Sequence, residues 1–405
     1  MEFVKSISEN EYNEFIENHE LGHFLQSAEW GRFKSKYGWK HELVGIKEAG
    51  TIIGATMIMY RKLPLVSKRI AYSPRGIILD YNNKELLKFM LENIKKHTKS
   101  KGAIFYKIDP FIRYKERFLD GEYLSDGFDN THIINELKNL GGKHKGLFLD
   151  FNGMQPRFSM WLDINKDISD VFKSFTSKFR YNIRLAEKKG VEVSEGTRGD
   201  LKEFQRIMKI TGERDGFISR PLEYFENMYE ELSKTGMIKL FLAKFNIEKR
   251  IKTIDEEIIA SPDRKEKLLA EKKLLEAELK SNPNGITVSG TIAIKKAGKV
   301  CYLYGASDNK YRNIMPNHLI QWEMIKWAKE ENSYLYDFRG ISGDLNPANK
   351  LYGLYKFKKG FNPELVEYIG EFDFINNKIY YIIWEKLLPR FIKLRRRIYK
   401  VIKRK

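Results

Sequence analysis

The chain has 405 residues, of which 42% are hydrophobic and 13% aromatic, and its formal net charge is +19. This composition excludes wholesale disorder and gives enough length for two domains with separate cores. A single cysteine, Cys301, excludes a disulfide scaffold and a cysteine-rich zinc site. The polar start is unlike a signal peptide, and no apolar run reaches the ~18 residues of a spanning helix, so we expect a cytoplasmic protein.

The first 150 residues follow an α/β pattern. Two strands, Trp39–Lys47 and Ile52–Tyr60, form a predicted hairpin between helical stretches. A later buried strand, 103–108, ends at Asp109, where α/β proteins commonly bind ligands. A carboxylate before Pro110 is equally typical of a turn cap, so both interpretations stay open.

Residues 157–245 repeat this order of elements. A helix is predicted from Ser174 to Lys189, and strands resume at Thr287–Lys295 and Lys299–Tyr304. From Cys301 to Phe361 an aromatic strand, a helix, a second strand and a glycine-rich turn follow, which is the layout of an α/β acyltransferase half. The predicted fold is therefore mixed α/β, with two acetyltransferase-like (GNAT-type) domains.

The segment Gly353–Phe361 is both cationic and aromatic. Such a segment can stack on a base or sugar and neutralise a phosphate, or it can be a solvated basic loop. These two interpretations stay open on the residues alone.

An insertion at 246–283 interrupts the second domain. Isoleucines recur at spacings of four, three and four from Ile247, which predicts an antiparallel coiled-coil hairpin of two helices. Nine basic and nine acidic residues leave the hairpin without net attraction for a phosphate backbone. A solubilised spacer is therefore the default function, and recognition of a large partner by shape stays open.

The end of the chain is strongly basic. Between Glu385 and Lys405 ten basic residues accompany one acidic residue, and a helix is predicted from about Asn377 to Lys403 with a break at Pro389. Such a helix suits an anionic membrane surface, or it packs on the first domain with a solvated end. We assign 1–153 and about 367–405 to the first domain and 154–366 to the second.

Several chemistries are excluded. The chain has no Walker A loop, no dinucleotide-binding glycine loop and no coenzyme A pyrophosphate loop, and its seven histidines show no metal-ligand spacing. We therefore expect no cofactor and no metal. An acyltransferase-like fold without a coenzyme A loop needs a different acyl donor that is already activated.

A set of motifs along nearly the whole chain resembles the FemABX peptidyltransferases, in the branch with a coiled-coil arm. The motifs are Phe24–Ser27 with Trp30, Tyr72–Gly76, Gln155–Phe158, Asn182–Val191, Arg214–Phe217, Leu303–Ser307 and Phe357–Phe361. They occur in the order expected for that family.

The resemblance implies an aminoacyltransferase that moves glycine, alanine or serine from aminoacyl-tRNA to the stem-peptide amine of a peptidoglycan precursor. The acceptor would be lipid II or a UDP-linked muropeptide, and the basic tail favours lipid II at the inner face of the plasma membrane. A later bridge extender, which acts on an already substituted precursor, stays open. So does a non-catalytic tRNA- or lipid-binding protein. An N-acyltransferase with a small acyl donor is disfavoured by the missing coenzyme A loop.

The resemblance also implies roles for individual residues. Lys34 and Arg220 resemble residues that grip the precursor's diphosphate, and Tyr224 and Tyr304 resemble tyrosines of the substrate cleft.

Three further residues are implied in the chemistry. Asp109 resembles the acidic residue near the stem peptide, and Phe357 with Lys358 resembles the pair that meets the aminoacyl-tRNA end. Because the donor ester is already activated, the enzyme needs to position an amine, remove its proton and stabilise an oxyanion. Asp109 either accepts the proton or orients the amine, and Lys358 neutralises a tRNA phosphate or the oxyanion, of which the first is our primary expectation.

Overall fold

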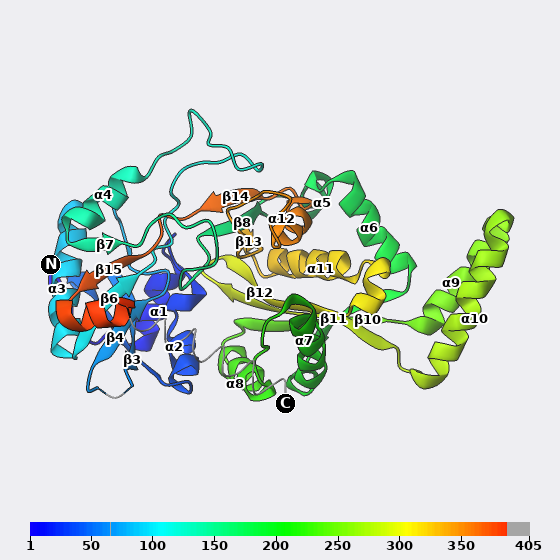
Figure 1. The fold of residues 1–405 in the computed structure, drawn as a ribbon, viewed down its shortest axis with the longest axis horizontal. Coiled ribbons are helices and arrows are strands. Elements are labelled where there is room, and N and C mark those ends of the chain that lie inside the picture. Colours follow the sequence, from blue (N-terminus) through cyan, green and yellow to red (C-terminus); the bar gives the residue numbers. More distant parts are fainter. Residues whose placement is uncertain (65, 387–405) are drawn as a thin grey trace. The chain divides into compact units, whose positions relative to one another are not determined.

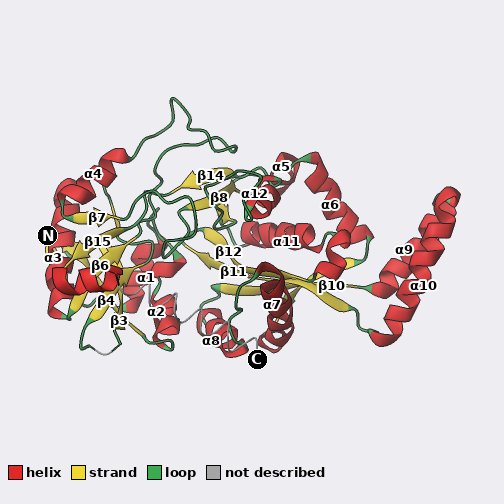
Figure 2. Cartoon of the chain, in the orientation of Figure 1, coloured by secondary structure: helices red, strands yellow, loops and turns green. Residues whose placement is uncertain are grey.

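The computed structural model describes residues 1–64 and 66–386, which divide into two compact units. Each unit is built around one mixed sheet covered by helices (Figures 1 and 2). Among the described residues, unit 1 contains Met1–Glu116, Tyr123–Arg157 and 367–386, and unit 2 contains Arg117–Glu122 and Phe158–Val366.

Unit 1 has an eight-stranded sheet in the order β1-β2-β3-β4-β6-β15-β7, with β5 paired to β3. Its strands are β1 (Glu2–Val4), β2 (Trp39–Glu48), β3 (Thr51–Lys62), β4 (Arg69–Ser73), β5 (Ile78–Leu79), β6 (Ala103–Ile108), β7 (Gly142–His144) and β15 (Phe372–Ile375). Its helices are α1 (Glu9–Glu17), α2 (Ala28–Ser35), α3 (Lys84–Ser100) and α4 (Thr131–Asn139).

The core of unit 1 follows from strand alternation. Side chains such as Val44 and Ile58 point to the face where the apolar stripe of α3 packs. The opposite face of β2 and β3 contacts α2 closely at Gly31, where an added Cβ would lie 2.7 Å from the side chains of His41 and Met57. The start of α3 is fixed by Asn83, whose side chain accepts a hydrogen bond from the Leu86 backbone N–H at 3.0 Å.

Unit 2 has a seven-stranded sheet in the order β14-β8-β13-β12-β11-β10-β9. Its strands are β8 (Phe158–Asp163), β9 (Val191–Gly196), β10 (Ile238–Phe245), β11 (Ile286–Lys296), β12 (Lys299–Ser307), β13 (Leu335–Asp337) and β14 (Glu364–Glu367). Its helices are α5 (Ile168–Ser174), α6 (Ser177–Lys188), α7 (Leu201–Asp215), α8 (Leu222–Ser233), α9 (Ile247–Ala260), α10 (Lys265–Ser281), α11 (Pro316–Glu330) and α12 (Tyr352–Lys359). Helices α7 and α8 lie on one side of this sheet and α11 lies on the other (Figure 1).

The two sheets repeat one pairing pattern. From β1 to β15 the successive pairs are antiparallel, antiparallel, antiparallel, parallel and antiparallel, and the pairs from β9 to β8 follow the same sequence. In both units the parallel pair is joined through a crossover helix, α3 between β4 and β6 and α11 between β12 and β13. The predicted duplicated α/β fold is therefore confirmed.

The helix predicted from Ser174 to Lys189 is present as α6 over Ser177–Lys188. It begins three residues later than predicted, because Phe175 adopts an extended conformation and buries its ring against Trp322 and Phe361, which separates α6 from α5. Of the two open interpretations of Gly353–Phe361, a solvated loop is excluded, since residues 352–359 form α12. The predicted C-terminal helix is present over 378–386, and its remainder lies outside the described residues.

Helices α9 and α10 form the insertion between β10 and β11 and pack side by side (Figure 1). At their base Arg250 is 1% exposed, and its guanidinium donates hydrogen bonds to Glu271 at 2.9 Å and Glu257 at 3.1 Å. Lys188 of α6 binds the same Glu257 at 3.1 Å, which anchors the hairpin to the body of unit 2. A coiled-coil geometry for this pair stays a prediction.

We expect Gly360→Ala to destabilise unit 2, because the added Cβ would lie 2.1 Å from the ring of Phe179. Overpacking of this kind costs about 1–3 kcal/mol. Gly353→Ala in the same helix is the matched control, since nothing lies within 4 Å of its Cβ position and alanine favours a helix by up to about 1 kcal/mol. Urea unfolding measures both free energies, and equal shifts in the two variants would contradict the packing.

Candidate functional site

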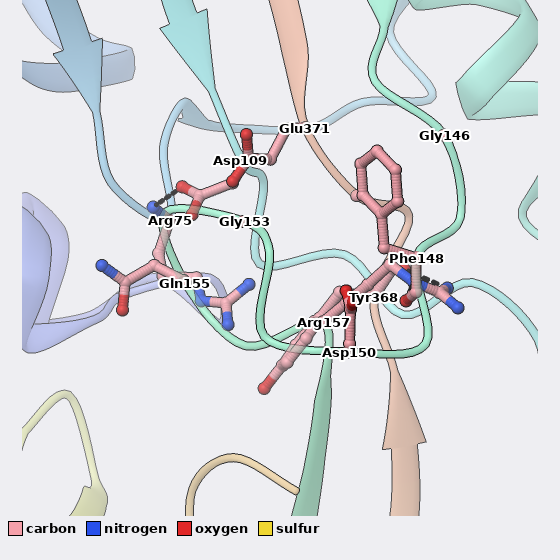
Figure 3. A pocket seen from close by; sticks show the side chains of 11 residues that line it. Arg75, Asp109, Gly146, Phe148, Asp150, Gly153, Gln155, Arg157, Tyr368 and Glu371 are labelled. Atoms are coloured by element: carbon pink, nitrogen blue, oxygen red, sulfur yellow. Dashed lines mark hydrogen bonds between the residues drawn. The ribbon is translucent and has the colours of Figure 1, made fainter. Parts of the chain in front are cut away.

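A narrow pocket lies in unit 1 at the end of β6, where Asp109 follows the strand (Figure 3). The segment 146–157 curves around it and contributes more than half of its lining. The lining residues are Arg75, Asp109, Gly146, Phe148, Asp150, Gly153, Gln155, Arg157, Tyr368, Gly370 and Glu371.

Asp109 is held by two hydrogen bonds. The Tyr72 hydroxyl donates to Oδ2 at 2.9 Å, and the Arg75 backbone N–H donates to Oδ1 at 2.6 Å. The carboxyl is 3% exposed, and this burial, together with the charge of Glu371, raises its pKa to about 6 despite the opposing charge of Arg75. A carboxylate with such a pKa is ionised at neutral pH and is a better proton acceptor than an ordinary aspartate.

Arg75 forms another wall of the pocket. Its backbone is in the left-handed region, with φ 55°, which turns its N–H toward Asp109. Its guanidinium stacks 4.0 Å from the Tyr368 ring centre and donates to the Pro156 carbonyl at 2.6 Å. Its buried Nε has no hydrogen-bond partner among the described residues, and it lines a pocket that also contains carboxylates. The pocket therefore presents groups of both charges.

Glu371 connects the pocket to the loop around it. One of its oxygens binds the ammonium of Lys107 at 2.8 Å, and the other accepts a hydrogen bond from the Met154 backbone N–H. Lys107 also binds Asp373 at 2.8 Å. This ion-pair network fixes the position of the Glu371 carboxylate in the pocket.

In unit 2 three predicted residues come together near the start of α8. The Arg220 guanidinium is exposed and lies 5.0 Å from the Tyr224 ring centre. Phe225 packs edge-on against Tyr224 at 5.9 Å and against Tyr304 of β12 at 5.3 Å. The result is an exposed cationic side chain beside a mostly buried aromatic cluster, and the guanidinium suits a phosphorylated ligand.

Lys358 lies inside unit 2. It is 3% exposed, and its ammonium donates hydrogen bonds to the carbonyls of Arg339 at 3.1 Å and Gly340 at 2.9 Å. Desolvation lowers its pKa to about 7, although the nearby Asp337 carboxylate opposes this shift. Asp337 accepts hydrogen bonds from the Ser159 hydroxyl at 2.5 Å and the Arg339 N–H at 2.7 Å. Lys358 thus fixes the turn after β13 and lies near the midpoint of its titration at neutral pH.

Phe357, the neighbour of Lys358 on α12, belongs to an aromatic cluster. Its ring centre lies 5.3 Å from His318, 5.9 Å from Phe179 and 5.6 Å from Phe361. Desolvation lowers the pKa of His318 to about 4, so its imidazole is neutral at physiological pH. Phe357 is half-buried and keeps part of its ring accessible to a ligand.

The predicted site residues are divided between the two units. Lys34 and Asp109 belong to unit 1, whereas Arg220, Tyr224, Tyr304, Phe357 and Lys358 belong to unit 2. Lys34 is not part of the pocket lining, and its ammonium lies 5.9 Å from the Trp30 ring centre and 5.6 Å from that of Phe33.

The sequence analysis missed several residues around Asp109 and Lys358. Arg75, Gln155 and Arg157 lie within motifs that carried the resemblance, so that signal was available. Asp337 lies at the end of a strand, much as Asp109 does, and the same position rule would have found it. Glu371 gave no signal, because its place beside Asp109 depends on the pairing of β15 with β6.

The described residues contain no group of three or more His, Cys, Asp or Glu side chains arranged to hold a metal ion. Within 1–64 and 66–386, no helix has the length and apolar character needed to cross a bilayer.

Comparisons with known proteins match nearly the whole chain. The FemAB family model matches residues 7–277 and 263–387. The lipid II:glycine glycyltransferase of Staphylococcus epidermidis is 34% identical over 426 residues, covering 99% of both chains. Its Staphylococcus aureus counterpart is 34% identical over 429 residues, covering 98% of this chain and 99% of the relative.

Two solved structures show the same architecture. The crystal structure of FemX superposes with a TM-score of 0.82 at 33% identity, covering 95% of this chain and all of that one. A tandem GNAT protein from the clavulanic acid biosynthesis pathway gives a TM-score of 0.51 at 8% identity, covering 93% of this chain and 98% of that one, and it supports the fold alone.

The buried amine of Lys358 predicts a pH-dependent stability. Between its folded pKa of about 7 and an unfolded value of about 10.4, the unfolded chain binds one more proton. In this range the Lys358 amine therefore makes the free energy of unfolding rise by about 1.4 kcal/mol for each pH unit. We expect Lys358→Met to lose this rise, whereas Lys356→Met, an exposed neighbour on α12, keeps it. Urea unfolding of the three proteins at several pH values checks this, and parallel curves would contradict it.

Proposed function

Because the chain belongs to the FemAB family, we propose that it transfers an amino acid from aminoacyl-tRNA to the stem-peptide amine of lipid II and so builds the interpeptide bridge of peptidoglycan. The observation that carries this proposal is the 34% identity, over nearly the full length of both chains, to proteins named lipid II:glycine glycyltransferase. We propose glycine as the amino acid because both relatives are named for it.

The first chemical step is attack of the acceptor amine on the ester carbonyl of the donor. The amine nitrogen forms a bond to that carbon, the bond to the tRNA ribose oxygen breaks, and the proton that the attacking amine loses is passed to the departing ribose oxygen. A lysine-type ammonium has a pKa of ~10.4 in water, so it must be desolvated and its proton accepted nearby. We assign this acceptance to Asp109, whose raised pKa and buried position in the pocket support the role.

The remaining predicted residues bind the substrates in this proposal. Lys34 and Arg220 hold the diphosphate of the precursor, and Tyr224 and Tyr304 line its path. The exposed guanidinium of Arg220 beside Tyr224 supports this assignment.

Phe357 and Lys358 serve the aminoacyl-tRNA end. Because the Lys358 ammonium is buried against two carbonyls, contact with a tRNA phosphate requires it to leave them. If the Lys358 ammonium stays on these carbonyls, its contribution is to hold the turn at Arg339 and Gly340 in position. Turnover with full aminoacyl-tRNA unchanged in Lys358→Met would exclude a contribution of either kind.

We further propose that the protein works at the inner face of the plasma membrane from the cytoplasm. The basic residues that support this, nine of them beyond residue 386, lie outside the described residues. A chain truncated after Trp384 should bind anionic vesicles more weakly than the full chain, as measured by co-sedimentation.

The decisive test is transfer to lipid II with a tRNA pool charged with one amino acid at a time, read by mass spectrometry. We expect one glycine to be added to unsubstituted lipid II. Addition only to lipid II that already bears a residue would assign a later extension step. No transfer to either acceptor would refute the proposed activity.

Asp109→Asn should lower kcat/KM for transfer by about 10²–10⁴-fold, the range for loss of a proton-transfer group. Asp80→Asn is the matched control, because Asp80 is an exposed carboxylate of the same unit that accepts a hydrogen bond from the Asn82 N–H. A similar loss in both variants would contradict a specific role for Asp109.

The pH profile gives a second check on Asp109. Its pKa of about 6 means that the carboxylate is protonated as the pH falls below this value, so kcat/KM should fall about tenfold per unit there. This acidic limb should be absent from the residual activity of Asp109→Asn. A limb that persists in the variant would belong to another group.

A further inference from the structure

The loop beside the pocket exposes an unusual number of apolar side chains. Between residues 147 and 154, five large hydrophobic side chains are each 39–50% exposed. They are Leu147, Phe148, Leu149, Phe151 and Met154. Contiguous exposed apolar surface of this kind marks an interaction site rather than ordinary protein surface. We refer to residues 147–154 as the apolar loop.

The apolar loop is held in a defined shape. At its start the Lys145 backbone N–H donates to the Glu371 carbonyl at 2.9 Å, and at its end the Met154 N–H donates to the Glu371 side chain. Between these points the Arg157 Nε donates to the Phe148 carbonyl at 2.7 Å. The loop therefore presents its hydrophobic side chains without an ordering step, so less conformational entropy is lost on binding.

A second apolar surface lies on the helix at 378–386 of the same unit. The helix at 378–386 buries Tyr381 and exposes Ile379, Ile382 and Ile383, which share one face at spacings of three and four. Lys145, which starts the loop, lies 3.4 Å from the Tyr381 hydroxyl and also pairs with Glu385. The exposed isoleucines and the loop thus belong to neighbouring parts of unit 1.

Positive charge borders the helix surface. Lys143 is about half exposed next to Tyr381, and Lys378 and Lys386 are exposed on the helix. The sequence then adds nine basic and no acidic residues from 387 to 405. Asp150 is the acidic residue within the loop. Hydrophobic side chains with a cationic border match the acyl boundary and the charged headgroups of an anionic bilayer.

We propose that the apolar loop inserts into the headgroup region of an anionic phospholipid bilayer, with the exposed face of helix 378–386 as a second contact. The loop lines the Asp109 pocket, so insertion brings that pocket to the membrane surface, where the stem peptide of a lipid-linked precursor is found. Only this last consequence rests on the proposed function, and membrane insertion can be measured without any donor or acceptor.

Site-specific fluorescence tests the insertion directly. The single native cysteine, Cys301, is buried, so an environment-sensitive thiol probe should label Leu149→Cys selectively. The matched control is Leu274→Cys on α10, an exposed leucine in unit 2. With vesicles containing phosphatidylglycerol we expect a blue shift at position 149 and none at 274, and a much smaller shift with phosphatidylcholine alone.

Three results would overturn the proposal. The first is no shift at position 149. The second is an equal shift at both positions. The third is a shift that appears without vesicles and grows with protein concentration, which would assign the loop to contact with a second copy of the chain.

A binding measurement provides an independent check. The variant Leu147→Ser with Leu149→Ser and Phe151→Ser should lose at least about tenfold in affinity for anionic vesicles, because three inserted side chains are removed. Ile259→Ser with Leu274→Ser on the hairpin should bind as the unmodified chain does. Unchanged vesicle affinity in the loop variant would refute the insertion. Neither the fluorescence experiment nor the vesicle-binding experiment measures transfer. Their result therefore holds whether or not the proposed enzymatic activity is found.

Discussion

The structure depends most on a buried carboxylate at the end of the parallel strand pair in each unit. Asp109 follows β6 beside β4, and Asp337 ends β13 beside β12. An ionised group taken out of water needs compensating hydrogen bonds and charges, and in both units a backbone N–H and a side-chain hydroxyl provide them. This requirement shapes the turns that follow, so in both candidate sites the residues lie where they compensate the buried carboxylate.

The two units surround their buried carboxylates with different neighbours. Around Asp109 the neighbours are Arg75 and Glu371, and a pocket remains between them. Near Asp337 the interior is filled by Lys358, whose amine satisfies two main-chain carbonyls. The same fold therefore gives one unit a carboxylate that faces a pocket. It gives the other unit a buried lysine with a pKa of about 7. Such a difference is expected when duplicated domains acquire separate functions.

The sequence predicted those features that depend on local pattern. The duplicated order of elements and the pair of helices in the insertion both follow from periodicity. Motifs established the family, which the comparisons confirm. Element ends were less predictable where tertiary packing overrides local preference, as at Phe175, whose burial delays the start of α6 to Ser177. The site was only partly predictable, because Glu371 reaches Asp109 through a strand more than 260 residues later in the chain.

The position of the helical hairpin in the sheet has a consequence for how this protein can diversify. Phe245 and Ile286 are directly paired across β10 and β11, so the hairpin leaves and re-enters the sheet at one ladder position. Its outer turns can lengthen or shorten together without changing the strand register. Its first turns cannot, because Ile247, Arg250 and Leu275 are buried at the base. The length of the hairpin can therefore change in evolution without a change in its buried base or in the residues of the two sheets.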